Sequence, residues 1–305
     1  MNRRSFLLKT AAASFAMAVQ PLRANPASTL HVATNTYPWG TFARRDGETF
    51  ELHTDQSLAA VSSTGITGYE PIINAPTECE GLGARLKKHG LQMRSLYVNS
   101  VLHNEKAADS MATVLGIARG ATSLGTRIIV TNPSPIRWGG PENKTDAQLR
   151  TQAKALDQLG SELRKLGLTL AYHNHDAELR LGAREFHHML AGTDPANVKL
   201  CLDAHWIFRG CGDSQVALFD AVELYGGRIV ELHLRQSRGG VWTEVFTSEG
   251  DIDYARLSAW LRKNALKPHL VLEQAVETGS PKKLDVVAAH RQGLANVHQL
   301  FDWMA

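Results

Sequence analysis

Short runs of β-branched and apolar residues alternate with longer stretches of helical periodicity from about residue 30 onward. The runs begin roughly 25 to 40 residues apart, which is the length of one strand, one helix and their loops. Eight such units, with no strand-only stretch between them, predict one (β/α)8 TIM barrel over residues 29–305. The predicted strands are residues 29–34, 65–73, 91–98, 126–131, 168–173, 198–203, 229–235 and 268–273.

One connecting helix has readable boundaries. Thr145 and Gln148 have the spacing of a capping box, in which each side chain bonds the backbone N–H of the other residue. Gly167 is placed to end the helix. Between them runs an apolar stripe at helical spacing, which predicts a helix that packs on the barrel.

The first residues have the pattern of an export signal. Arg3 and Arg4 precede a short, moderately apolar run, and the pair followed by Phe-Leu resembles a twin-arginine signal. Pro21 and Pro26 argue against the alternative of a buried first helix, and the run is too short to span a bilayer. We therefore predict a twin-arginine-type signal peptide at residues 1–24. The twin-arginine export machinery would be a partner, and the mature protein would be periplasmic without membrane insertion.

Composition supports a globular protein without a strong charge. Hydrophobic residues make up 43% and charged residues 21%, so the chain can bury a substantial core. Subtracting the four basic residues of the predicted signal from 33 Lys and Arg leaves 29, against 30 Asp and Glu. A net charge near −1 does not favour nucleic-acid binding. Three cysteines form neither a disulfide framework nor a zinc-finger pattern.

Four strands end in polar side chains that the alternation of a strand directs into the barrel. Active sites of such barrels lie at these C-terminal strand ends. Two imidazoles and two carboxylates suit Mn, Co, Zn or Fe better than Ca or Mg, so we predict one divalent metal ion. The alternative is that the four side chains only satisfy one another. From the fifth to the eighth strand they are His173, Asp203, His233 and Glu273.

The seventh strand carries further polar residues on its predicted inward face. Glu231 and Arg235 share that face with His233, whereas Val230 is expected to point towards the helices. Arg235 is therefore placed to hold a substrate oxygen, or else to pair with a neighbouring acid.

Five segments carry a specific pattern: residues 172–176 (YHNHD), 201–206 (CLDAHW), 228–236 (RIVELHLRQ), 250–254 (GDIDY) and 272–273 (LE). Together they resemble the xylose isomerase-like barrels, a superfamily of sugar isomerases, epimerases, dehydratases and endonucleases. In the epimerase branch, strands 5 to 8 supply Glu, Asp, His and Glu to a metal, and the resemblance implies these roles for the four residues above. Here His173 replaces a Glu that also acts as one of two bases in epimerases, and Arg235-Gln236 replaces a common Lys-Asp.

The resemblance implies a metal-dependent sugar isomerase or epimerase that acts on a hydroxy-carbonyl sugar through a metal-stabilised enediolate. Catalytic candidates are Glu273 and His175 as bases and Arg235 as a contact to the developing negative charge. Their alternative roles are structural hydrogen bonds and ion pairs. Candidate substrate contacts are Glu70, Trp39 and Trp206, with salt bridging or core packing as the alternatives.

Two other functions stay open at this stage. A lyase or dehydratase acting on a keto-sugar or keto-glycoside needs only one acid/base residue, which suits the loss of a Glu at position 173. A non-catalytic periplasmic sugar-binding barrel would not need the metal. An abasic-site endonuclease would need more metal ligands and a basic face, which the sequence lacks. The sequence is compatible with an oligomer but does not establish one.

Overall fold

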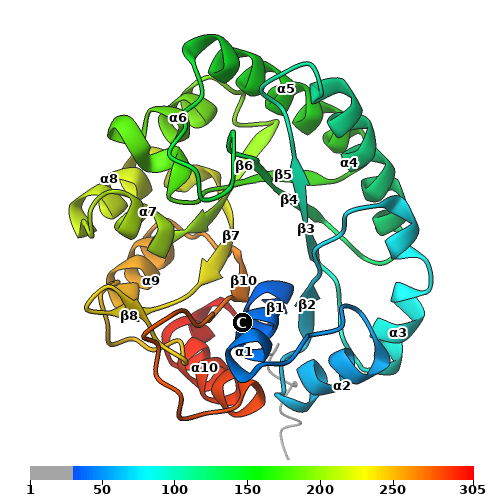
Figure 1. The fold of residues 1–305 in the computed structure, drawn as a ribbon, viewed down its shortest axis with the longest axis vertical. Helices are drawn as coiled ribbons and strands as arrows, with labels where there is room; N and C mark the ends of the chain where they lie inside the picture. The colour runs from blue at the N-terminus through cyan, green and yellow to red at the C-terminus, as the bar shows by residue number, and fades with distance from the viewer. Residues whose placement is uncertain (1–29) are drawn as a thin grey trace, which may run out of the picture.

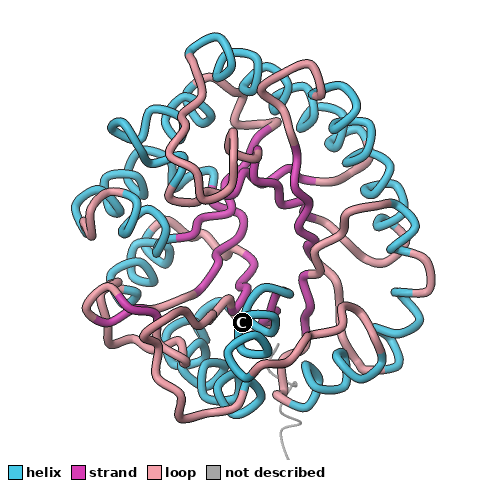
Figure 2. The backbone as a smooth tube through the Cα atoms, viewed as in Figure 1, coloured by secondary structure: helices cyan, strands magenta, loops and turns pink. Residues whose placement is uncertain are grey.

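The computed structural model describes residues 30–305, in which eight parallel strands form a barrel inside a ring of helices (Figures 1 and 2). The strand order is β2-β1-β10-β7-β6-β5-β4-β3. Parallel bridges from Gly68 to Gln92 and from Ile72 to Tyr97 join β2 to β3 and close the ring. All eight predicted strands are present: β1 (Val32–Asn35), β2 (Gly68–Glu70), β3 (Ser95–Ser100), β4 (Ile128–Pro133), β5 (Thr169–His173), β6 (Val198–Asp203), β7 (Ile229–Leu234) and β10 (His269–Leu272).

Helices connect the strands and cover the outside of the barrel (Figure 1). Helix α5 has the predicted capping box between Thr145 and Gln148, and Gly167 follows it with a positive φ of 75°. A short hairpin of β8 (Ser237–Arg238) and β9 (Val241–Trp242) follows β7. The longer helices are α1 (Thr36–Asp46), α2 (Asp55–Ser63), α3 (Leu82–Lys88), α4 (Ala107–Thr122), α5 (Asp146–Lys165), α6 (Arg180–Ala191), α7 (Ala204–Gly210), α8 (Gln215–Tyr225), α9 (Tyr254–Lys263) and α10 (Val286–Phe301).

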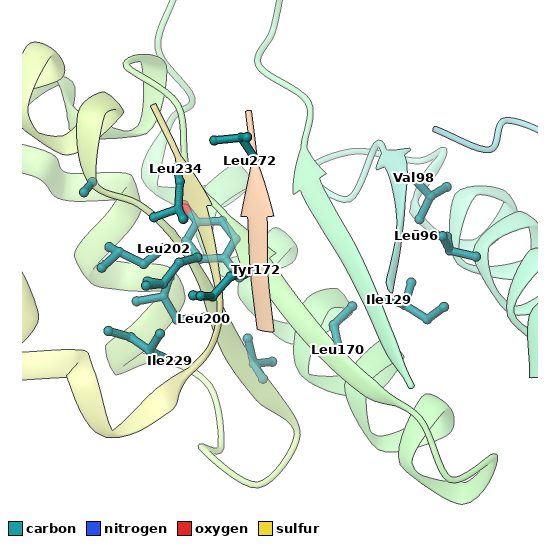
Figure 3. Close-up of a cluster of buried hydrophobic side chains, with 14 of the residues drawn as sticks. Leu96, Val98, Ile129, Leu170, Tyr172, Leu200, Leu202, Ile229, Leu234 and Leu272 are labelled. Carbon is teal, nitrogen blue, oxygen red and sulfur yellow. The ribbon is translucent and has the colours of Figure 1, made fainter. Parts of the chain in front are cut away.

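The largest apolar core lies between the strands and the helices (Figure 3). Alternate strand residues such as Leu200 and Leu202 of β6 belong to this layer and are almost fully buried. Their neighbours Cys201 and Asp203 lie on the opposite face of the strand, inside the barrel. A small apolar cluster of Val130, Ala171 and Cys201 lies on this inward side.

The structure corrects the expected orientation of Val230. Its side chain packs against the interior cluster rather than against the helices. The cause is a register shift between β6 and β7, where Leu200 pairs with Ile229 but the next residue, Cys201, pairs with Glu231. The extra residue in β7 breaks the strict alternation at Val230, after which Glu231 resumes the inward face.

The predicted signal peptide lies outside the described residues. Within residues 30–305, no helix combines the length and the apolar character needed to cross a membrane.

Candidate metal centre

Four ligand-type side chains meet at the carboxyl end of the barrel. His173 ends β5, Asp203 ends β6, His233 is next to last in β7, and Glu273 directly follows β10. One ligand atom from each lies within 4.8 Å of the others. The strand register explains this meeting, because Asp203 and Val271 are the Cα partners of His233 on its two neighbouring strands. The structure thus brings together the four residues predicted as metal ligands.

Each imidazole has one nitrogen close to another buried polar side chain. His173 Nδ1 lies 3.6 Å from Cys201 Sγ, which leaves Nε2 for a ligand. His233 Nε2 lies 3.3 Å from Glu231 Oε1 and 3.2 Å from Glu70 Oε1, which leaves Nδ1. A carboxylate behind a metal-binding imidazole fixes its tautomer and its ring orientation.

The charges around the centre fit a cation. Arg235 is the one permanently charged cation among four buried carboxylates; with Glu231 protonated, as described below, and both imidazoles neutral, two negative charges remain. Such an excess is costly in a buried site without counter-charge. In addition, His233 Nδ1 and Glu273 Oε2 approach to 2.7 Å without forming an aligned hydrogen bond, as two ligands of one ion would. The four carboxylates are those of Glu70, Asp203, Glu231 and Glu273.

Burial and charge set different protonation states within the centre. Burial, reinforced by the negative charge of Glu70, raises the pKa of Glu231 well above its usual value. Burial alone would raise the pKa of Glu273, but the positive charges of His233 and Arg235 lower it to about 2. Burial lowers the pKa of His173 well below its usual value, so its imidazole is neutral, the form that binds metals. The protonated Glu231 therefore lies below the centre, and the ionised Glu273 lies at the mouth of the barrel.

Asp203 has structural partners as well. Its Oδ1 accepts the backbone N–H of Trp206 at 3.0 Å, which caps α7, and its Oδ2 accepts Arg235 Nη2 at 2.6 Å. Each carboxylate oxygen has a second lone pair, so both bonds are compatible with metal ligation. The Arg235 guanidinium lies 4.9 Å and 4.4 Å from the ring centroids of Trp206 and Trp242, close enough for cation–π attraction.

The structure corrects the expected substrate contact of Arg235. Its side chain points inward as the strand alternation predicts, but it is fully buried and does not line the cavity described below. The hairpin after β7 carries Trp242, which covers the guanidinium. The geometry agrees with the alternative role of Arg235, an ion pair with a neighbouring acid, and Asp203 is the only acid it bonds at close range within residues 30–305.

A cavity of about 780 Å³ opens above the centre. His173, Glu273 and Glu70 lie among its polar lining residues. Apolar walls with a few convergent polar groups are typical of small-molecule sites. The apolar and aromatic wall residues are Tyr37, Phe50, Leu52, Ile72, Tyr97, Trp138 and Trp206.

His175, a predicted base, lines this cavity just beyond β5. Its ring stands edge-on to His173 at a centroid distance of 4.7 Å, and its Nδ1 has no partner in the described part of the chain. Burial lowers the pKa of His175 to about 4. Sequence reasoning missed Glu178, which accepts the His175 backbone N–H at 2.7 Å and an Asn132 N–H at 3.2 Å. This buried carboxylate fixes the loop that carries His175.

The three predicted substrate contacts have different surroundings. Trp206 and Glu70 line the cavity, and Glu70 also accepts the Ser95 hydroxyl at 3.0 Å. Trp39 does not line it, which corrects the prediction. Its side chain is 1% exposed and stacks on His290 at 4.7 Å. Helix α1 begins directly after β1 and turns Trp39 towards α10, so it packs in the core.

Comparisons with known proteins agree with this architecture. The sequence model of the xylose isomerase-like TIM barrel family matches residues 58–296. The fold is similar to a sugar phosphate isomerase/epimerase from Parabacteroides distasonis (16% identity, TM-score 0.67, 89% of this chain and 96% of that chain). It is also similar to an L-ribulose 3-epimerase (16% identity, TM-score 0.64, 90% of this chain and 95% of that chain). A D-allulose 3-epimerase from Methylomonas sp. is similar as well (12% identity, TM-score 0.67, 90% of this chain and 98% of that chain). No curated protein matches in sequence.

Proposed function

The chain belongs to the xylose isomerase-like TIM barrel family, and on that premise we propose that it is a divalent-metal-dependent sugar isomerase or epimerase. The observation that carries the proposal is the convergence of His173, Asp203, His233 and Glu273 beneath a cavity of about 780 Å³. The substrate would be a sugar with a hydroxyl next to a carbonyl. The sugar epimerases among the structural neighbours support this substrate class.

The four residues would hold one ion, with Mn, Co, Zn or Fe favoured over Mg by the two imidazoles. When bound, the ion supplies electrostatic stabilisation of the negative charge that develops as the α-proton leaves. Arg235 and the amino end of α7 keep Asp203 in place, and Glu231 and Glu70 keep the His233 ring turned towards the cavity.

Two side chains at the cavity can accept the α-proton. His175 presents a ring that has no hydrogen-bond partner at Nδ1 in the described residues, directly beside the centre. Glu273 presents a carboxylate that is 7% exposed, at the end of β10. The aromatic walls around them, including Trp138 and Trp206, offer flat apolar surfaces to a sugar ring and limit the access of water.

A lyase or dehydratase acting on a keto-sugar or keto-glycoside is the second candidate, and His173 favours it. The resemblance to epimerases implies a carboxylate base at this position, and an imidazole beside Cys201 replaces it here. Elimination of a β-substituent needs one residue to take the α-proton and return it to the leaving group, which His175 can do alone.

Two measurements test these proposals. Metal analysis of the purified protein should find one divalent ion per chain, lost in Asp203→Asn. A protein that binds no ion, even after loading, would leave only the sugar-binding alternative. Incubation of sugars and keto-sugars in deuterated water should then show deuterium in a product of unchanged formula for an isomerase or epimerase. A product that has lost water or an aglycone would identify the lyase. His175→Gln should slow either reaction, with His187→Gln as the control, because His187 of α6 bonds Tyr225 and does not line the cavity.

We also propose that the protein is exported to the periplasm through its predicted twin-arginine signal. Replacing Arg3 and Arg4 by lysine should retain it in the cytoplasm, as cell fractionation would show. An unchanged distribution would contradict this route.

A further inference from the structure

The opposite end of the barrel holds a second group of polar side chains that the proposed reaction does not use. A hollow of about 410 Å³ lies where the strands begin. It adjoins a second hollow of about 730 Å³, and both are lined by Arg94 and Arg127. These arginines precede β3 and β4, and the Arg127 backbone N–H donates to Arg94 O at 2.8 Å, so they are neighbours.

All charged side chains that line the two hollows are basic, and the one acidic group there is the terminal carboxylate of Ala305 in the smaller hollow. The basic side chains are Lys87, Arg94, Arg127 and Lys267, and no Asp or Glu among residues 30–305 lines either hollow. None of the four forms an ion pair within the described residues. Residues 1–29 contain no acidic residue either, so they cannot supply the missing negative charge. Four basic side chains against one terminal carboxylate leave a local excess of positive charge, in a chain that is nearly neutral without its predicted signal.

Two imidazoles lie together in the smaller hollow. The rings of His31 and His269 are 5.2 Å apart between centroids. Both nitrogens of His31 and Nε2 of His269 are buried without a hydrogen-bond partner in the described part of the protein. A buried polar atom left without a partner costs about 1–3 kcal/mol, so such atoms normally bind something.

The barrel makes room for one of these rings. A Cβ atom at Gly68 would lie 2.5 Å from His31 Cε1, well inside contact distance. The same Cβ would also lie 2.9 Å from Ala33 Cα in the neighbouring strand, so glycine at this position allows both the close strand pairing and the placement of the His31 ring.

We propose that this end of the barrel binds a phosphate-type oxyanion, held by Arg94 and Arg127 over the His31–His269 pair. Guanidinium groups and imidazole N–H groups are the donors that proteins use for such anions, and paired arginines match the tetrahedral oxygens geometrically. Lys267 Nζ donates to an oxygen of the Ala305 terminal carboxylate at 3.4 Å, which offsets its charge, so the arginines are the main ligands. The anion is inorganic phosphate or the phosphate group of a small organic ester.

Phosphate titration of the whole protein tests the proposal. Thermal unfolding should show a saturable rise in Tm with inorganic phosphate that chloride at equal ionic strength does not produce. Arg94→Gln/Arg127→Gln should weaken phosphate binding by about tenfold or more in calorimetry. Both arginines are exposed, so the variant should fold. The matched control is Lys106→Gln/Arg150→Gln, which removes two exposed cations near the mouth of the barrel and should bind phosphate as the wild type does.

The design separates this site from other causes. Phosphate bound at the metal centre would raise the Tm of the wild type and of both double variants equally, and this result would overturn the proposal. A Tm that rises without saturation would indicate an adventitious ion only and would overturn it too. Glycerol phosphate in place of inorganic phosphate distinguishes an organic ester from the free anion as the preferred ligand. Nitrogen-15 NMR of the histidine rings should show shifts at His31 and His269 on binding, and unmoved signals would also contradict the site.

Discussion

Glu231 Oε1 lies 3.3 Å from His233 Nε2, on the opposite side of the imidazole ring from Glu273. Glu231 is completely buried, and His233 is its only ionisable basic partner within residues 30–305. A protonated Glu231 still accepts the imidazole N–H through its carbonyl oxygen, and an acceptor in this place turns the other ring nitrogen of a metal-binding histidine towards its ion.

Replacing Glu231 should therefore change metal affinity without touching a ligand. Glu231→Leu removes the acceptor, and we expect about a 10–100-fold loss of affinity for the divalent ion. Glu231→Gln keeps an acceptor oxygen and should lose less. Competition with a chromophoric chelator measures both constants, and the absorption spectrum of the cobalt-loaded protein reports the ligand geometry. Equal affinities in wild type and Glu231→Leu would show that Glu231 does not orient His233.

The pair of Asp203 and Arg235 predicts a stability effect. Asp203→Asn leaves a buried guanidinium without its acid partner, which should cost about 3–5 kcal/mol of unfolding free energy. Asparagine still caps α7, so the loss would come from the charge. Arg235→Met in the same chain should recover most of this loss, because neither charge is then unpaired. Urea unfolding of the metal-free wild type, the two single variants and the double variant measures this double-mutant cycle. If the losses of unfolding free energy in the single variants add up in the double variant, the two residues are not coupled.

The fold and the four ligands could be predicted from the sequence because both follow from regular periods. The alternation of side chains along a strand predicts which residues point inward, and their positions at the strand ends predict that they meet at one rim of the barrel. The sequence-based predictions were wrong where the tertiary structure departs from the regular alternation of side chains. Val230 turns inward at a register shift, Arg235 is covered by a hairpin whose position no local pattern encodes, and Trp39 follows the direction of α1. Glu178 was missed because its role depends on a loop contact to His175.

His290 predicts a pH dependence of stability. It is fully buried between Trp39 and Thr34, and burial lowers its pKa to about 4. The unfolded chain, with a histidine pKa near 6.5, binds more protons between these values, so stability is fully present above about pH 6.5 and falls as the pH drops towards 4. The difference of pKa values corresponds to about 3 kcal/mol.

His290→Phe keeps an aromatic ring against Trp39 and removes the titrating group. Its unfolding free energy should therefore depend less steeply on pH between 6.5 and 4 than that of the wild type. Unfolding by urea at several pH values gives the two slopes. Parallel slopes would show that His290 is not the titrating group.

Trp138 predicts an effect on substrate binding alone. It lines the cavity, and its side chain is 53% exposed, so its removal should barely change Tm. Loss of a flat stacking surface worth about 0.5–1.5 kcal/mol should raise KM roughly 2- to 12-fold with little change in kcat. Steady-state kinetics on the identified sugar would measure both. Trp303, which packs against the core and does not line the cavity, is the control aromatic residue. A fall in kcat in Trp138→Ala would mean that Trp138 takes part in the chemical step.

His173 decides between the two proposed reactions. Its ring lies 4.6 Å from that of His233 and contacts the cavity, so a carboxylate placed there would reach both the ion and the substrate. His173→Glu should restore a second base and give formation of the epimeric sugar, with deuterium at the inverted carbon in deuterated water. General-base catalysis is worth about 10²–10⁴-fold, so the rate should exceed that of His173→Gln by at least about 100-fold. Gln has nearly the same shape without the base, so equal rates in the two variants would mean that position 173 only holds the ion. The variant should also gain more Tm from added metal, because a fifth buried carboxylate increases the negative charge that the ion neutralises.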